Sequence, residues 1–147
     1  MLEGGRLARA KGLLLALFDA AARERAEVVL VCFGGGGAER RFGPAVPRWW
    51  NARWLAPLGG AGGTPLARGL EVARAQLAQA TRRRPGATRW LWLLSDMRTD
   101  ERPPRPAQAD AVQIVDFDDA RVRLGRAERL AHDWDAPCST PDRLIRN

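Results

Sequence analysis

Several residue types are scarce in this chain of 147 residues, and the few cysteines and histidines exclude two classes of site. Tyrosine is absent, lysine occurs once, and the single histidine is His132. The two cysteines, Cys32 and Cys138, have neither CxxC spacing nor a nearby histidine cluster, which excludes the usual zinc sites. His132 lies beside Asp133 in a segment with helical periodicity, where adjacent positions do not face each other, so no catalytic His–Asp pair is expected.

Long apolar runs are also missing from the sequence. The run Leu13–Leu17 is soon followed by Asp19 and Arg23, well short of the roughly 18 to 20 apolar residues that span a bilayer. The N-terminal region shows no signal-type pattern of an apolar stretch and a cleavage site. We therefore predict a cytoplasmic protein without a membrane partner.

Basic charge is abundant, with a net charge of +7, but it is nearly all arginine. A basic chain raises nucleic acid as a partner. Here Lys11 is the only lysine, and the abundance of Ala, Gly and Arg resembles the coding bias of a GC-rich genome. Because aromatic residues do not interleave with the arginines in the manner of a stacking surface, we expect no nucleic-acid partner.

Helices and strands alternate along the chain, judged from apolar periodicity and from glycine and proline breaks. Helices are predicted at 6–25, 64–82 and 125–135, with a short one near 49–55 that Trp50 and Trp54 would anchor on the core. Strands are predicted at 27–33 (buried on both faces), 38–42 (ended by Pro44 and Pro47), 89–95 (an inner strand) and 111–117. Residues from Pro137 onward show no pattern. This order predicts an α/β layered domain with a mainly parallel sheet flanked by helices.

One glycine-rich stretch, GGAGGTPL at Gly59–Leu66, leads into the second long helix. Thr64 is predicted as its N-cap and Pro65 as its first helical residue. The stretch has no lysine before its threonine, so it is not a phosphate-binding P-loop. Asp96 directly follows the strand that this helix leads into, and in parallel sheets ligands bind outside the carboxyl ends of the strands.

A hydroxyl at Thr64 and a carboxylate at Asp96 would supply hard oxygen ligands for Mg²⁺ or Mn²⁺, although two ligands are few for an ion that takes six. An equally weighted alternative is that Asp96 only caps the turn after its strand. The acidic cluster of Asp116, Asp118 and Asp119 at the next strand end is interpreted as a solvated turn.

The stretches GGAGGTPLARGLEVA, LLSDMR and VQIVDFDDARVRLGRAERLA together resemble the von Willebrand factor A domain at the C-terminal end of the D-type subunit of magnesium chelatase and its cobalt-chelatase relatives. The opening RLARAKGLLLALFDAA and EVVLVCFGGGGAERRF are similar to the first helix and second strand of that domain. The resemblance runs to about Ala136, which implies a domain at 1–136 and a tail at 137–147.

The resemblance implies a metal-ion-dependent adhesion site with Thr64 and Asp96 as Mg²⁺ ligands. Gly62, Gly63, Pro65, Ser95 and Arg98 would support them. The family's DxSxS motif and the first strand that carries it have no counterpart here, so Mg²⁺ is expected to bind weakly or not at all. Three explanations of the missing strand compete. The chain is a fragment of a longer protein, which we favour, or it is a degenerate domain, or a partner supplies the strand. In a degenerate domain the strands at Val28 and Leu91 would pair directly.

By the same resemblance the chain is expected to be a non-catalytic module that grasps an acidic residue on an AAA+ ATPase subunit, or on another protein, through Mg²⁺. Two alternatives are a metal-free scaffold that docks through its arginines and a small Mg²⁺-dependent phosphohydrolase that uses Asp96.

Overall fold

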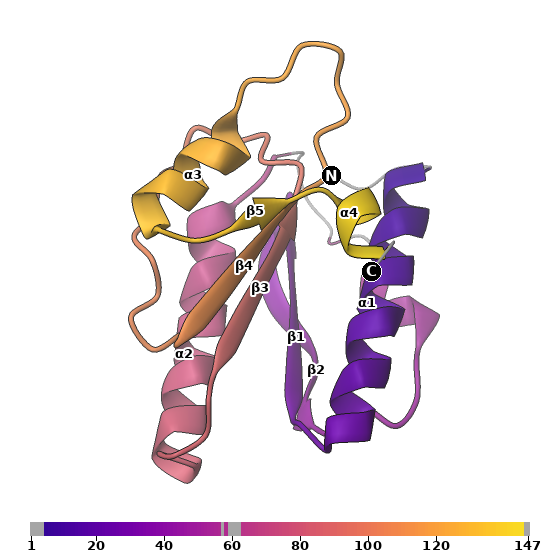
Figure 1. The fold of residues 1–147 in the computed structure, drawn as a ribbon, viewed down its shortest axis with the longest axis vertical. Coiled ribbons are helices and arrows are strands. Elements are labelled where there is room, and N and C mark those ends of the chain that lie inside the picture. Colours follow the sequence, from indigo (N-terminus) through magenta and orange to yellow (C-terminus); the bar gives the residue numbers. More distant parts are fainter. Residues whose placement is uncertain (1–4, 57, 59–62, 146–147) are drawn as a thin grey trace.

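The computed structural model describes residues 5–56, 58 and 63–145. The described elements follow one another as α1 (Gly5–Glu24), β1 (Val28–Gly34), β2 (Gly37–Ala45), a 3-10 turn η1 (Ala52–Leu55), α2 (Leu66–Arg83), β3 (Trp90–Ser95), β4 (Ala111–Asp116), α3 (Arg126–Trp134), β5 (Cys138–Ser139) and α4 (Pro141–Ile145), as Figure 1 shows. None of these helices is both long enough and apolar enough to cross a membrane.

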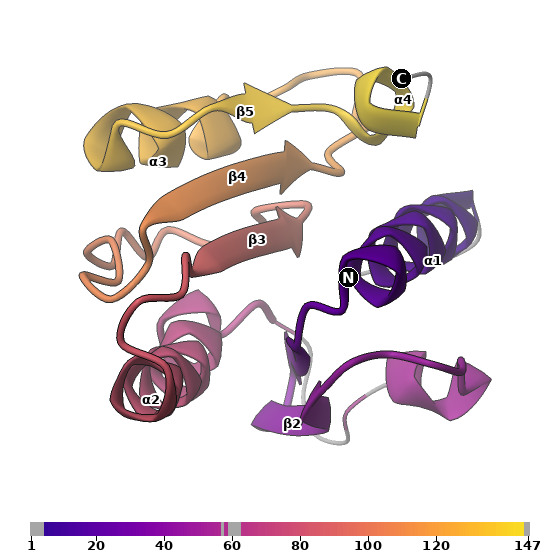
Figure 2. The same ribbon diagram turned by 60° about the horizontal axis from the view of Figure 1, so that its bottom comes forward.

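The strands form two separate sheets. β3, β4 and β5 lie in that order and are all parallel, with Trp90 opposite Ala111 and Ser95 opposite Asp116. β1 and β2 form an antiparallel hairpin. Figure 2 shows the hairpin apart from the three-stranded sheet. The predicted α/β architecture with a parallel sheet flanked by helices is therefore confirmed.

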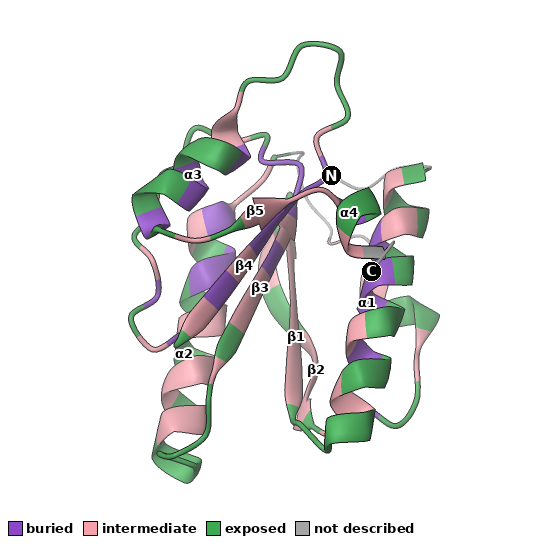
Figure 3. Ribbon diagram, viewed as in Figure 1, coloured by how far each residue is buried: buried purple, intermediate pink, exposed green. Residues whose placement is uncertain are grey.

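Within the described residues, β1 and β3 do not pair with each other. The direct pairing expected of a degenerate domain is thus not seen. Two burial predictions are also wrong. β1 was expected to be buried on both faces but is half-buried throughout, because only β2 pairs with it among the described strands (Figure 3). The inner strand of the parallel sheet is β4, not β3, and Trp90 at the start of β3 is 56% exposed.

Helices cover the two faces of the parallel sheet and create two apolar cores (Figure 2). On one face α2 and α3 pack on β3 and β4 through a core that includes Leu66, Leu70, Ile114 and Leu130. On the other face α1 packs on β4 through Ala10, Leu13, Val115 and Phe117. Apolar residues on both faces of β4 explain why its last residues are almost fully buried.

Trp54 fills the space between α1 and β2. It is 6% exposed, and its ring centroid lies 5.8 Å from that of Phe18 and 4.7 Å from that of Phe42. Trp50 joins the same cluster at 5.3 Å from Trp54. The predicted anchoring of this short segment on the core is confirmed.

Apart from small shifts at the ends of elements, three features differ from the sequence prediction. α2 begins at Leu66, with Pro65 in the cap position, rather than at Pro65 with Thr64 as the cap. β2 continues through Pro44 to Ala45, because one side of this strand has no ladder partner among the described residues and a missing N–H is tolerated there. Residues after Ala136 carry β5, which extends the parallel sheet, and α4, which contacts α1. Both are too short to show a periodicity.

Candidate functional site

Asp96 lies at the carboxyl end of β3, where the chain turns out of the sheet. Its Oδ1 accepts a hydrogen bond from the backbone N–H of Arg98 at 3.2 Å, and the Oγ of Ser95 accepts one from the N–H of Met97 at 3.0 Å. Asp96 is 2% exposed and Ser95 is fully buried. These bonds confirm that Asp96 caps the turn after its strand. They do not test its predicted role as a metal ligand.

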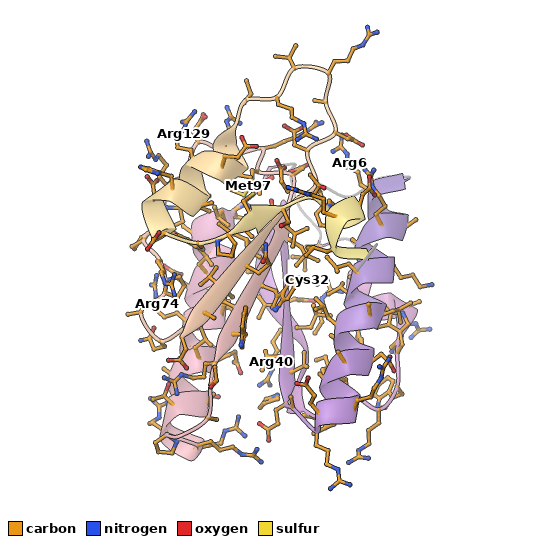
Figure 4. All side chains as sticks on the ribbon, viewed as in Figure 1. Arg6, Cys32, Arg40, Arg74, Met97 and Arg129 are labelled. Atoms are coloured by element: carbon orange, nitrogen blue, oxygen red, sulfur yellow. The ribbon has the colours of Figure 1, made fainter. Side chains whose placement is uncertain are left out.

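The other carboxylate oxygen of Asp96 faces arginine side chains. Its Oδ2 lies 3.2 Å from Nη1 of Arg6, at the start of α1, and 3.5 Å from Nε of Arg98. The Asp96 side chain is 1% exposed, that of Arg6 18% and that of Arg98 59%. Figure 4 shows Arg6 at the same end of the molecule as Met97, which follows Asp96. A nearly buried carboxylate at the strand end is therefore balanced by guanidinium groups.

The same arginine reaches a second carboxylate, on the loop that follows β4. Arg6 donates from Nε to Oδ1 of Asp119 at 2.9 Å, and Arg9 donates from Nη2 to its Oδ2 at 3.1 Å. Desolvation acts to raise the pKa of Asp119, but the charges and hydrogen bonds of Arg6 and Arg9 outweigh it and lower that pKa. The first turns of α1, the end of β3 and the loop after β4 thus share one charge network.

The acidic cluster at the end of β4 is only partly the solvated turn that was predicted. Asp118 donates its backbone N–H to Oδ1 of Asp116 at 2.9 Å, and Ala120 donates to Oδ1 of Asp118 at 3.1 Å, which is turn capping. Asp116, however, is only 7% exposed. Burial raises the pKa of its carboxyl group.

The glycine-threonine-proline loop approaches the same edge of the sheet. Gly62 lies outside the described residues, Gly63 has a positive φ of 130°, and Thr64 is half-buried. The predicted N-cap role of Thr64 is wrong, because Leu66 donates its N–H to the backbone carbonyl of Thr64 at 2.8 Å and to Oε1 of Glu101 at 2.9 Å.

Glu101 belongs to the loop that begins at Asp96, and its carboxylate also accepts from the Thr99 hydroxyl at 3.3 Å. The loop that carries Thr64 is therefore fastened to the loop that follows Asp96. This places the two predicted metal ligands on neighbouring loops at one edge of the sheet.

The described residues do not by themselves fit a divalent cation at this edge. Mg²⁺ needs about six oxygen ligands in near-octahedral geometry. Within the ranges that the structure describes, no three His, Cys, Asp or Glu side chains gather as a metal-binding group. Both oxygens of Asp96 already have hydrogen-bond or ion-pair partners, and the nearest of these at Oδ2 are cationic.

Sequence reasoning missed two residues of this site. Arg6 was placed only in the predicted helix at 6–25, and Glu101 lies outside every predicted element. Arg6 lies 90 positions from Asp96 and Glu101 lies 35 from Leu66, so no local pattern connects either pair.

Comparison with known proteins gives one relationship. The chain is similar to magnesium-chelatase 60 kDa subunits. The subunit of Cereibacter sphaeroides is 42% identical over 93 residues and that of Rhodobacter capsulatus is 39% identical over 93 residues. Each alignment covers 63% of this chain and 16% of the relative. No protein-family model matches the chain, and no solved structure matches it significantly.

Proposed function

We propose that this chain is a non-catalytic protein-binding module of a magnesium-chelatase-like system, with a fold of the von Willebrand factor A type. The similarity to two magnesium-chelatase 60 kDa subunits is the observation that carries this proposal. The partner would be an AAA+ ATPase subunit, or another protein that presents an acidic residue. ATP hydrolysis would belong to that partner.

The binding surface would be the strand-end surface, which we define by Arg6, Arg98, Asp119, Val122 and Leu124. Two of its members are apolar and project into solvent, since Val122 is 77% exposed and Leu124 is 57% exposed. Both lie in the loop that rises above the strand ends in Figure 1. Arg121 and Arg123 alternate with them in the sequence. Apolar side chains set among arginines suit a partner whose apolar pocket is rimmed by carboxylates.

In this proposal the chain alone binds Mg²⁺ only weakly. Thr64 and Asp96 would be its ligands, and further oxygen ligands from outside the described residues would be needed. When bound, the ion would offer a partner's carboxylate a hard cation. Such a complex would be reversed by a chelator.

A second candidate function is metal-free docking through arginines, and one observation favours it. Asp96 is already balanced by Arg6 and Arg98, and the Arg98 side chain is 59% exposed beside it. An exposed guanidinium can accept a partner's carboxylate directly. Phosphohydrolase chemistry is the poorest fit, because an Asp96 side chain that is 1% exposed and ion-paired is badly placed to meet a phosphoryl group. A turnover of phosphate esters that disappears in Asp96→Ala would revive it.

Binding of the purified AAA+ ATPase subunit of a magnesium chelatase, measured by surface plasmon resonance, tests the proposal. The double variant Val122→Ser/Leu124→Ser should weaken binding at least about tenfold, since each removes apolar contact area. Leu15→Ser is the matched control, because Leu15 is an exposed leucine on α1, 38% exposed and outside the strand-end surface.

Two solution conditions separate the candidates. Binding that is lost in EDTA supports the metal-dependent form. Binding that persists in EDTA and falls steeply with salt supports docking through arginines. Absence of binding in both conditions, or an equal loss in Leu15→Ser, would contradict the proposed function.

A further inference from the structure

We propose that Arg6 is a built-in counter-ion that takes the place of a divalent cation at Asp96, so that metal binds at this strand end only weakly unless Arg6 is removed. This inference concerns the ion affinity of the chain itself. It stands or falls independently of the partner proposed above.

The geometry gives Arg6 a fixed position. Its Nη1 lies 3.2 Å from Oδ2 of Asp96, while its Nε donates to Oδ1 of Asp119 at 2.9 Å and its Nη2 lies 2.9 Å from the same oxygen. One guanidinium therefore bridges two carboxylates that come from different loops. With 18% of the side chain exposed, Arg6 is largely enclosed in this arrangement.

Arg98 and Arg9 are held less firmly. The Arg98 guanidinium lies 3.5 Å from Asp96 with a side chain 59% exposed, so it can turn away into solvent at little cost. The Arg9 side chain is 35% exposed, and it contacts Asp119, whose side chain is 46% exposed. Of the two arginines described beside the Asp96 carboxylate, Arg6 is thus the one that combines proximity to Oδ2 with enclosure.

A divalent ion at Oδ2 of Asp96 would meet the positive charge of Arg6 within a few ångströms and at low solvent exposure. Repulsion between like charges at this distance is strong in a partly buried site. An ion could bind only by displacing Arg6 from both of its carboxylates. With Arg6 absent, the same enclosure leaves a nearly buried carboxylate whose charge favours a cation.

The test is a titration with Mn²⁺, which prefers the same oxygen ligands as Mg²⁺ and whose free ion is read by electron paramagnetic resonance. Arg6→Met keeps an unbranched apolar stem and removes the charge. We expect it to bind Mn²⁺ at least about tenfold more tightly than the unmodified chain, the change that ~1.4 kcal/mol represents. Arg9→Met is the matched control and should leave Mn²⁺ binding unchanged, because Arg9 contacts Asp119 and not Asp96.

The double variant Arg6→Met/Asp96→Asn assigns the gain to this carboxylate and should abolish it. Thermal melting with and without Mn²⁺ covers the case in which Arg6→Met is too unstable to titrate, since the ion should then restore its fold. The inference is overturned if the unmodified chain binds Mn²⁺ as tightly as Arg6→Met does. It is equally overturned if Arg6→Met neither gains affinity nor is stabilised by the ion, or if Arg9→Met gains as much.

Discussion

The carboxylate of Glu101 caps a helix that begins 35 residues earlier, because its Oε1 accepts a hydrogen bond from the backbone N–H of Leu66 at 2.9 Å. The first N–H groups of a helix lack partners within the helix, and an anion at that end also interacts favourably with the helix dipole. Thr99 holds the loop in place, since its hydroxyl lies between the Glu101 N–H at 3.1 Å and the Glu101 carboxylate at 3.3 Å. The loop after Asp96 therefore stabilises the first turn of α2.

Replacing Glu101 by alanine should destabilise the protein by about 1 kcal/mol, the usual cost of a lost N-terminal cap. Glu101→Gln should lose less stability, because an amide oxygen can still accept a hydrogen bond from the backbone N–H of Leu66. Thr64→Val should change the free energy of unfolding by less than about 0.5 kcal/mol, since the Thr64 hydroxyl is not the cap of α2. Urea unfolding of the three variants measures this. A larger loss in Thr64→Val than in Glu101→Ala would contradict the observed cap.

Gly69 is required where α2 passes over β1. An added Cβ at this position would lie 2.7 Å from the ring atoms Cγ and Cδ1 of Phe33. Gly69→Ala should therefore destabilise the protein by about 1 to 3 kcal/mol through overpacking, despite the better helix propensity of alanine.

Gly12, in the exposed part of α1, is the matched control. A Cβ there would meet nothing within 4 Å. Gly12→Ala should stabilise the protein by up to about 1 kcal/mol, from helix propensity alone. Differential scanning calorimetry should show melting temperatures that move in opposite directions. An increase in melting temperature in both variants would mean that α2 does not pack on Phe33 as closely as described.

Asp116 should make stability depend on pH in the sense opposite to most carboxylates. Burial raises its pKa in the folded state, so between the unfolded and the folded pKa values the folded protein binds more protons than the unfolded chain. The contribution of Asp116 to stability is therefore greatest at acid pH and declines as pH rises through that window. Asp116→Asn keeps an Oδ1 acceptor for the Asp118 N–H and should raise the melting temperature at pH 7 by a few degrees.

Asp119→Asn supplies the contrast for this measurement. The pKa of Asp119 is lowered by Arg6 and Arg9 against the effect of desolvation, so its contribution is present above the unfolded pKa and is lost as pH falls through the folded value. Asp119→Asn should therefore lose stability at neutral pH, and the loss should fade in acid. Unfolding curves between acid and neutral pH that show the same trend in both variants would contradict the assignment.

Cys138 should react slowly with alkylating reagents in the folded protein. Burial, together with the nearby carboxylates of Asp116 and Glu128, raises the pKa of its thiol from 9.0 to about 11. At pH 8 the thiolate fraction falls about a hundredfold, and the thiolate is the reactive form. In a Cys32→Ser background, iodoacetamide labelling followed by mass spectrometry should be correspondingly slower in buffer than in urea. Equal rates in the two solvents would show that Cys138 is not protected as described.

Most of the regular elements could be read from local patterns. α1, α2 and α3 carry apolar residues at three- and four-residue steps, and the strands at 90–95 and 111–116 are short, mainly apolar runs between clear breaks. β5 and α4 could not be predicted in this way, because elements of two and five residues contain too little repetition. Their positions depend on the edge of β4 and on the surface of α1, which exist only in the folded chain.

Local sequence patterns are sufficient to predict the α/β class, the order of the elements and a turn capped by Asp96, since each of these depends on residues within a few positions of one another. The residues that face Asp96 and cap α2 become apparent only in the folded structure. Arg6 and Glu101 reach those positions from 90 and 35 residues away, and the charge balance and hydrogen bonds that they provide arise when α1, β3 and α2 meet at one edge of the sheet. Interactions between such distant residues depend on packing geometry, which no local pattern records.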